Sequence, residues 1–161
     1  MKKPEIKEIE EKLKRLLGIS SFPDYELKID NSLNKRTAFN KKIGNKYIIT
    51  ISTDKDNKPN LSGFKHELIH LALKIFSYIN LDKNLSVSQE YEKDSDKADI
   101  FMEYLVIALE IKIGNPQDVE QNLENYEKYG FSEIRYFYDL ISNFIFNQTN
   151  IDDVIIKVNL M

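Results

Sequence analysis

The segment GFKHELIHLAL at residues 63–73 contains both histidines of the chain, His66 and His70, and Glu67 directly follows the first of them. The other residues of this segment are mostly apolar, and the pattern predicts a helix from Leu61 to about Ile79. Positions four apart lie on the same face of a helix, one turn from each other. The two imidazoles are therefore placed to bind one metal ion.

Periodicity and turn residues predict further elements on both sides of this helix. Before it we expect a helix and three strand segments: Pro4–Leu17, ending at Gly18, then Tyr25–Ile29, and a hairpin of Arg36–Phe39 and Lys46–Ser52 that turns near Gly44-Asn45. After it we expect helices at Ser86 or Ser88 to Ile113, Gln117–Lys128 and Ser132–Asn147, whereas Asp152–Met161 fits a strand or a helix. This order predicts one α+β domain over residues 1–161, with a small, mostly antiparallel sheet.

Composition excludes several classes of function. The chain has 23 basic and 26 acidic residues, so it lacks the positive excess of a general nucleic-acid or membrane-surface binder. It has no cysteine, which excludes disulfides and thiolate metal sites. No apolar run approaches the length that spans a bilayer, and the N-terminal residues do not form an export signal. We therefore expect a cytoplasmic protein.

The spacing of His66, Glu67 and His70 is that of a zinc peptidase. Zinc lowers the pKa of a water molecule that it binds to about 7, and a carboxylate beside the open coordination position can take the proton. Glu67 projects toward that position because it follows the first ligand. We expect a zinc-dependent enzyme that hydrolyses peptide bonds, with His66 and His70 as ligands and Glu67 as the general base.

The third zinc ligand has to be a carboxylate, because no histidine or cysteine remains. Along the helix that ends at Ile113, one flank carries Glu92, Asp99, Glu103 and Glu110. If this helix returns antiparallel to the first, a rise of about 1.5 Å per residue brings residues 95–103 level with the histidines. Asp99 and Glu103 then fit both the flank and the level. We choose Asp99, with Glu103 and Glu92 as the alternatives.

The histidine segment and the segment KADIFMEYLV at residues 97–106 together resemble the ImmA/IrrE family of HExxH metallopeptidases. Ala98, Asp99, Phe101 and Leu105 fall on the family's second pattern, E-x-E-A-(D/N)-x-F-A-x-x-L-L. The similarity covers roughly residues 36–106. It implies a zincin-like fold and, in many relatives, cleavage of a regulatory protein such as a mobile-element repressor. Ser95 stands where the family has its glutamate ligand, so the resemblance does not supply the third ligand.

The expected partner is a protein or peptide substrate, with no nucleic acid and no membrane. An extended peptide would lie along an edge strand, for which Lys46–Ser52 is the candidate. The aromatic residues of the segment 131–146 are expected to pack in the core, because they recur at helical spacing. The alternative to an enzyme is a zincin-like scaffold that binds partners without cleaving them.

Overall fold

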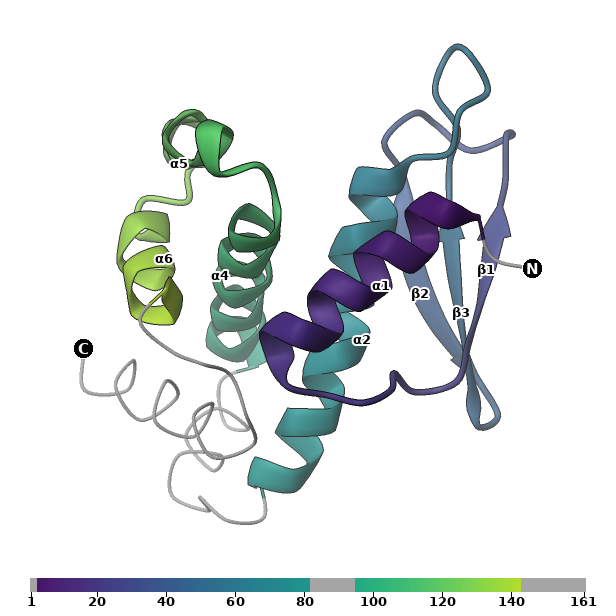
Figure 1. Ribbon diagram of the computed structural model, residues 1–161, viewed down its shortest axis with the longest axis horizontal. Helices are drawn as coiled ribbons and strands as arrows, with labels where there is room; N and C mark the ends of the chain where they lie inside the picture. Colours follow the sequence, from purple (N-terminus) through teal and green to yellow (C-terminus); the bar gives the residue numbers. More distant parts are fainter. Residues whose placement is uncertain (1–2, 82–94, 143–161) are drawn as a thin grey trace.

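The computed structural model describes residues 3–81 and 95–142, which adopt an α+β arrangement (Figure 1). A three-stranded sheet lies at one side, α1 and α2 cover one of its faces, and the remaining helices follow on the far side of α2 (Figure 1). The described elements are α1 (Pro4–Leu17), β1 (Tyr25–Ile29), β2 (Ala38–Ile43), β3 (Lys46–Ile51), α2 (Leu61–Leu81), α4 (Ser95–Ile113), a 3-10 turn (Pro116–Asp118), α5 (Val119–Lys128) and α6 (Ile134–Ser142).

Helix α1 has the bounds that the sequence predicts. Pro4 occupies its first turn, and Gly18 ends it in the left-handed conformation with a φ of 64°. This conformation lets the backbone N–H of Gly18 bond to the carbonyl oxygen of Lys14, which would otherwise lack a partner at the helix end. The apolar side of α1 is buried, with Leu13 and Leu17 fully enclosed.

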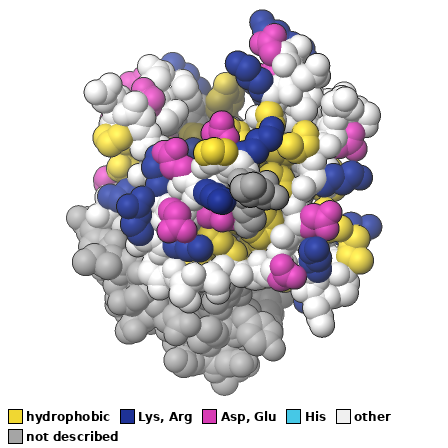
Figure 2. All heavy atoms as spheres, turned by 45° about the vertical axis from the view of Figure 1, so that its right-hand side comes forward, with side chains coloured by type: hydrophobic (Ala, Val, Ile, Leu, Met, Phe, Trp, Pro, Cys, Tyr) yellow, Lys and Arg dark blue, Asp and Glu magenta, His cyan; other side chains and the backbone are white. Residues whose placement is uncertain are grey.

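The sheet has the strand order β1-β3-β2. The predicted hairpin between β2 and β3 is confirmed, with Gly44 at a φ of 62° in its turn. However, β1 pairs with β3 in parallel, so the sheet is mixed and not mostly antiparallel. The most apolar strand, β3, takes the central position because Ile49 and Ile51 are fully buried there. On the face of the molecule seen in Figure 2, acidic and basic side chains are interspersed with apolar ones.

The start of α2 is fixed to the sheet by Asn60. The Asn60 side chain accepts a hydrogen bond from the backbone of Gly63 at 3.0 Å and donates one to the carbonyl oxygen of Thr37 at 3.3 Å. Gly63 lies so close to β2 that a Cβ atom there would be 2.6 Å from the Cβ of Ala38. The first turn of α2 therefore lies directly against β2.

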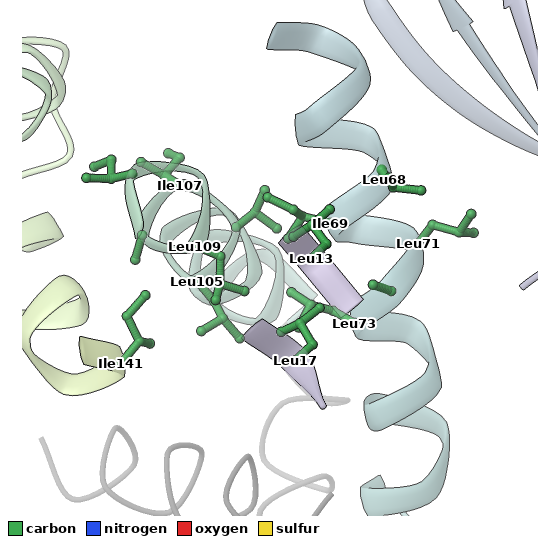
Figure 3. Packing of buried hydrophobic residues seen from close by; sticks show 14 of the residues in the cluster. Leu13, Leu17, Leu68, Ile69, Leu71, Leu73, Leu105, Ile107, Leu109 and Ile141 are labelled. Carbon is green, nitrogen blue, oxygen red and sulfur yellow. The ribbon is translucent and has the colours of Figure 1, made fainter. Parts of the chain in front are cut away.

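The main core forms where α1 meets α2 and α4. Figure 3 shows Leu13 and Leu17 of α1 between these two helices, beside Ile69 and Leu73 of α2 and Leu105 and Leu109 of α4. Leu68 and Leu71 project from another side of α2, toward the sheet (Figure 3). All of these side chains are buried. Since α2 is packed on both sides, it has little freedom to rotate, and the face that carries its histidines is fixed in direction.

The C-terminal helices are packed on α4. Gly130, with a φ of 100°, lies between α5 and α6, as the sequence predicts. Tyr104 of α4 stacks on Phe137 at a centroid distance of 4.8 Å and meets Phe131 edge-on at 5.6 Å. The prediction that aromatic residues of this segment pack in the core is thus confirmed for Phe131 and Phe137, while Tyr136 is 39% exposed.

Some sequence predictions lie outside the described residues. These are the start of the α4 helix at Ser86 or Ser88, the candidate ligand Glu92, the end of the last helix at Asn147 and the segment Asp152–Met161. Within residues 3–81 and 95–142, no helix combines the length and the apolar character needed to cross a membrane.

The close approach of α2 to β2 can be tested with Gly63→Ala. The added methyl group overlaps Asn60 and Ala38, so we expect a loss of about 1–3 kcal/mol in the free energy of unfolding. Urea denaturation followed by circular dichroism measures this loss. The control is Gly114→Ala, whose Cβ would meet its nearest neighbours at 3.4 Å and should not destabilise the protein. Equal destabilisation by both variants would contradict the close contact.

Candidate metal centre

The two histidines of α2 point at the same place. Their Nε2 atoms are 3.2 Å apart, and the ring centroids are separated by 4.8 Å. The side chains are 27% exposed for His66 and 21% for His70, so both are partly withdrawn from water but still reachable. This is the convergence that a spacing of four residues predicts on a helix.

Glu103 of α4 completes the cluster. Its Oε1 atom is 2.7 Å from Nε2 of His70, and its Oε2 atom is 3.5 Å from Nε2 of His66. Around a tetrahedral metal ion with bonds of about 2.0–2.1 Å, ligand atoms are separated by about 3.3 Å. One ligand atom from each of the three residues lies within 4.8 Å of the others, so the three residues could hold a metal ion.

Asp99 and Glu92, the other sequence candidates for the third ligand, are not tested by the geometry. Asp99 belongs to α4 and precedes Glu103 by one turn, but its side chain is outside the described set. Glu92 lies outside the described residues altogether. Among the side chains that the structure describes, the histidine pair meets Glu103, which the sequence offered as an alternative to Asp99.

A second carboxylate of α4 binds the far side of His66. Nδ1 of His66 donates a hydrogen bond of 2.9 Å to Oε1 of Glu110, which is only 8% exposed. The hydroxyl group of Tyr126 on α5 donates to the other carboxylate oxygen at 3.4 Å. A histidine held at Nδ1 presents Nε2 to a metal in a fixed direction, and the carboxylate makes that nitrogen a better ligand.

This role of Glu110 was missed by the sequence reasoning, although the residue was placed on the correct flank of the helix. The available signal was its isolation: Glu110 is the one charged residue within the apolar stretch LVIALEI at 105–111. A carboxylate in such a stretch needs a partner when it is buried. The spacing of Glu103 and Glu110 by seven residues, two helical turns, puts both on the side that faces α2.

The carboxylates change the protonation of the cluster. Burial lowers the pKa of His66, but hydrogen bonds and charge from Glu103 and Glu110 outweigh burial and raise it to about 10. Hydrogen bonds from His66 and His70 hold the pKa of Glu103 well below its usual range. Burial and the neighbouring Glu110 raise the pKa of Tyr126 to about 12. Without a metal, His66 therefore keeps a proton, because the two carboxylates favour a positive charge at this site.

Glu67 projects from α2 toward the sheet side of the cluster. Its Oε2 atom accepts a hydrogen bond from the side-chain amide of Asn40 on β2. A cleft of about 600 Å³ runs along this side, lined by residues of β2 and the segment before it, α2, α4 and α5: Arg36, Ala38, Asn60, Ser62, Gly63, His66, Glu67, Glu110 and Tyr126. A molecule in the cleft can thus contact both His66 and Glu67.

The strand that we expected at the edge of the sheet, as the place for an extended peptide, is not an edge strand. Lys46–Ser52 corresponds to β3, which is the central strand and has a neighbour on each side. Its buried isoleucines explain the difference, because a strand this apolar is more stable inside the sheet than at its edge. Within the described residues, β2 is an edge strand, and Ala38 of this strand lines the cleft.

Of the sequence candidates, the structure brings His66, His70 and Glu103 into one cluster. Glu67 lines the adjoining cleft together with His66. Comparison of the chain with models of protein families, with curated proteins and with solved structures finds no match. The resemblance to the ImmA/IrrE family therefore stays a prediction from the two motifs, and the site is interpreted from its own geometry.

Proposed function

We propose that this protein is a zinc-dependent peptidase in which His66, His70 and Glu103 bind the metal and Glu67 is the general base. The observation that carries the proposal is the convergence of two imidazole Nε2 atoms and one carboxylate within about 3.5 Å of one another. Glu67 follows His66 on the same helix and lines the adjoining cleft. This combination supplies a metal site and a base beside one substrate-sized space.

Zinc is the metal that suits this donor set best. Two imidazole nitrogens and one carboxylate oxygen are the protein ligands of catalytic zinc in one large class of peptidases, and they leave a fourth position for water or substrate. Structural zinc sites usually have four protein ligands. Among the described residues the cluster has three, His66, His70 and Glu103, and it borders a cleft. An open site of this kind favours catalysis over a purely structural role.

Glu67, Asn40 and Glu110 each have a separate role in the proposed hydrolysis. Bound zinc would polarise the peptide carbonyl and acidify the attacking water. Glu67 takes a proton from that water while the water oxygen forms a bond to the carbonyl carbon. Glu67 then delivers this proton to the amide nitrogen as the C–N bond breaks. Asn40 holds one oxygen of the Glu67 carboxylate, which leaves the other free for the proton. Glu110 keeps the ring of His66 in the orientation that directs Nε2 to the metal.

The substrate is proposed to be an extended peptide that pairs with β2. The outer edge of this strand offers backbone N–H and C=O groups that no described strand uses. A peptide added there would run past Glu67, because Asn40 of β2 already contacts that residue. Such docking requires a segment that is extended or locally unfolded. A regulatory protein, as the family resemblance implies, is one source of such a segment.

The ligand set is tested by zinc affinity in four variants. His66→Ala and His70→Ala should abolish stoichiometric zinc, because each leaves at most two of the three ligands. Glu103→Gln should weaken binding by more than about a hundredfold, since loss of a ligand exceeds the effect of losing an outer partner. Asp99→Asn, on the same helix, is the matched comparison and should change affinity less. Normal binding by Glu103→Gln with loss in Asp99→Asn would restore the choice made from the sequence.

The pH dependence of zinc binding follows from the protonation of His66. The metal needs the neutral imidazole, whereas the free protein keeps a proton on His66 up to a pKa of about 10. Protons therefore compete with zinc, and affinity should rise by about tenfold per pH unit between pH 6 and 8 for each proton displaced. Competition with a chelator of known pH dependence measures this slope. An affinity that does not change with pH would contradict the protonated cluster.

The role of the base is tested with Glu67→Gln. This variant should keep its fold and its zinc but lose turnover of a casein-type peptide substrate by at least about a hundredfold. Glu124→Gln, the same change at an exposed position of α5, should leave turnover unaltered. If the zinc-loaded protein cleaves nothing while it binds the metal fully, the scaffold alternative gains support. Unchanged cleavage by Glu67→Gln would show that another group is the base.

A further inference from the structure

One basic side chain lies in the cleft beside the metal centre. Arg36, in the turn before β2, lines the same cleft as His66 and Glu67 and is exposed. Its side chain makes no hydrogen bond or ion pair with any residue that the structure describes. The carboxylates of this cleft are already engaged, Glu67 with Asn40 and Glu110 with His66. The guanidinium group is thus available to a bound molecule.

The neighbouring basic residues differ from Arg36 in this respect. The segment from Asn31 to Thr53 contains five basic residues and no acidic one, in a chain with a net charge of −3. Lys46 pairs with Glu26 at 3.2 Å, and Lys42 lies over the ring of Tyr47 at 5.6 Å. Neither of these lysines lines the cleft. Within this segment, Arg36 is the basic residue placed to meet a substrate.

The backbone of Arg36 supports a role for its side chain. Its φ of 67° is in the left-handed region, which glycine and asparagine adopt much more readily than arginine. The turn itself is closed by a backbone hydrogen bond of 3.2 Å from Thr37 to Asn34, which needs no arginine. The geometry of the turn therefore does not explain why position 36 is an arginine, whereas the place of the Arg36 side chain in the cleft does.

We propose that Arg36 binds a carboxylate of the peptide substrate and so selects acidic substrates; this inference rests on the proposed peptidase function. A guanidinium group forms two parallel hydrogen bonds with a carboxylate. Glu67 and Glu110, at the metal end of the cleft, repel a carboxylate of the peptide at that end, which favours one orientation of the peptide. Arg36 precedes Asn40 by four residues, at most about 13 Å along an extended chain. The recognised carboxylate is therefore expected within about four residues of the bond that is cleaved.

The carboxylate has two possible sources, an acidic side chain or the C-terminal group of the peptide. Decapeptide mixtures distinguish them if they carry Glu or Gln at one fixed position and end in a free acid or an amide. Zinc-loaded wild-type protein should cleave the preferred carboxylate-bearing mixtures about tenfold faster than their neutral counterparts. The zinc-loaded Glu67→Gln variant should bind them more tightly by a similar factor, which measures recognition without turnover.

Arg36→Gln, introduced into the wild-type protein and into the Glu67→Gln variant, should remove this preference. Arg36→Glu should reverse it toward mixtures with Lys at the fixed position. Lys28→Gln removes the same charge from the exposed face of β1 and is the control, which should keep the preference. Equal rates and affinities for all mixtures, or a preference that survives Arg36→Gln, would overturn the inference. Absence of cleavage by the wild type would instead contradict the peptidase proposal, and binding that depends on Arg36 would still support the carboxylate site.

Discussion

The contact between the imidazoles of α2 and the carboxylates of α4 is the interaction on which the rest of the molecule depends. His66 and His70 meet Glu103 and Glu110 where α2 and α4 pack, between the apolar core on one side and the polar cleft on the other. Removal of charged groups from water is costly unless each has a partner. The four side chains are tolerated there because they satisfy one another, and they do so only at one register of the two helices.

The same contact connects the metal centre to the sheet. Helix α2 is fixed against β2 by the cap at Asn60 and by the close approach at Gly63, while its opposite side packs on α1. A displacement of α4 would disturb the histidines, and a displacement of β2 would disturb Glu67 through Asn40. Two of the three proposed metal ligands and the proposed base are therefore held by one helix that is packed on several sides, which is the rigid support that a catalytic site would require.

The proton on His66 also explains how the cluster can form without a metal ion. A proton on His66 balances part of the charge of Glu103 and Glu110, so the helices need no cation to come together. A divalent ion bound there would replace that proton in a cluster that is already arranged, so its binding would require little ordering. Glu110 contributes to both states, since it holds Nδ1 of His66 whether Nε2 carries a proton or faces a metal.

The sequence by itself determined the local features: the bounds of α1, the hairpin turn at Gly44, and the histidine pair with Glu67 beside it. Each depends on neighbouring residues, through periodicity or turn geometry. The tertiary structure alone decided the parallel pairing of β1 with β3 and the meeting of Glu103 with the histidines. Carboxylates one turn apart differ by about 6 Å along a helix, so which of them reaches the histidines depends on the packing between distant segments. The partnership of Glu110 with His66 and the place of Arg36 in the cleft likewise arise from contacts between elements far apart in the chain, which no local pattern encodes.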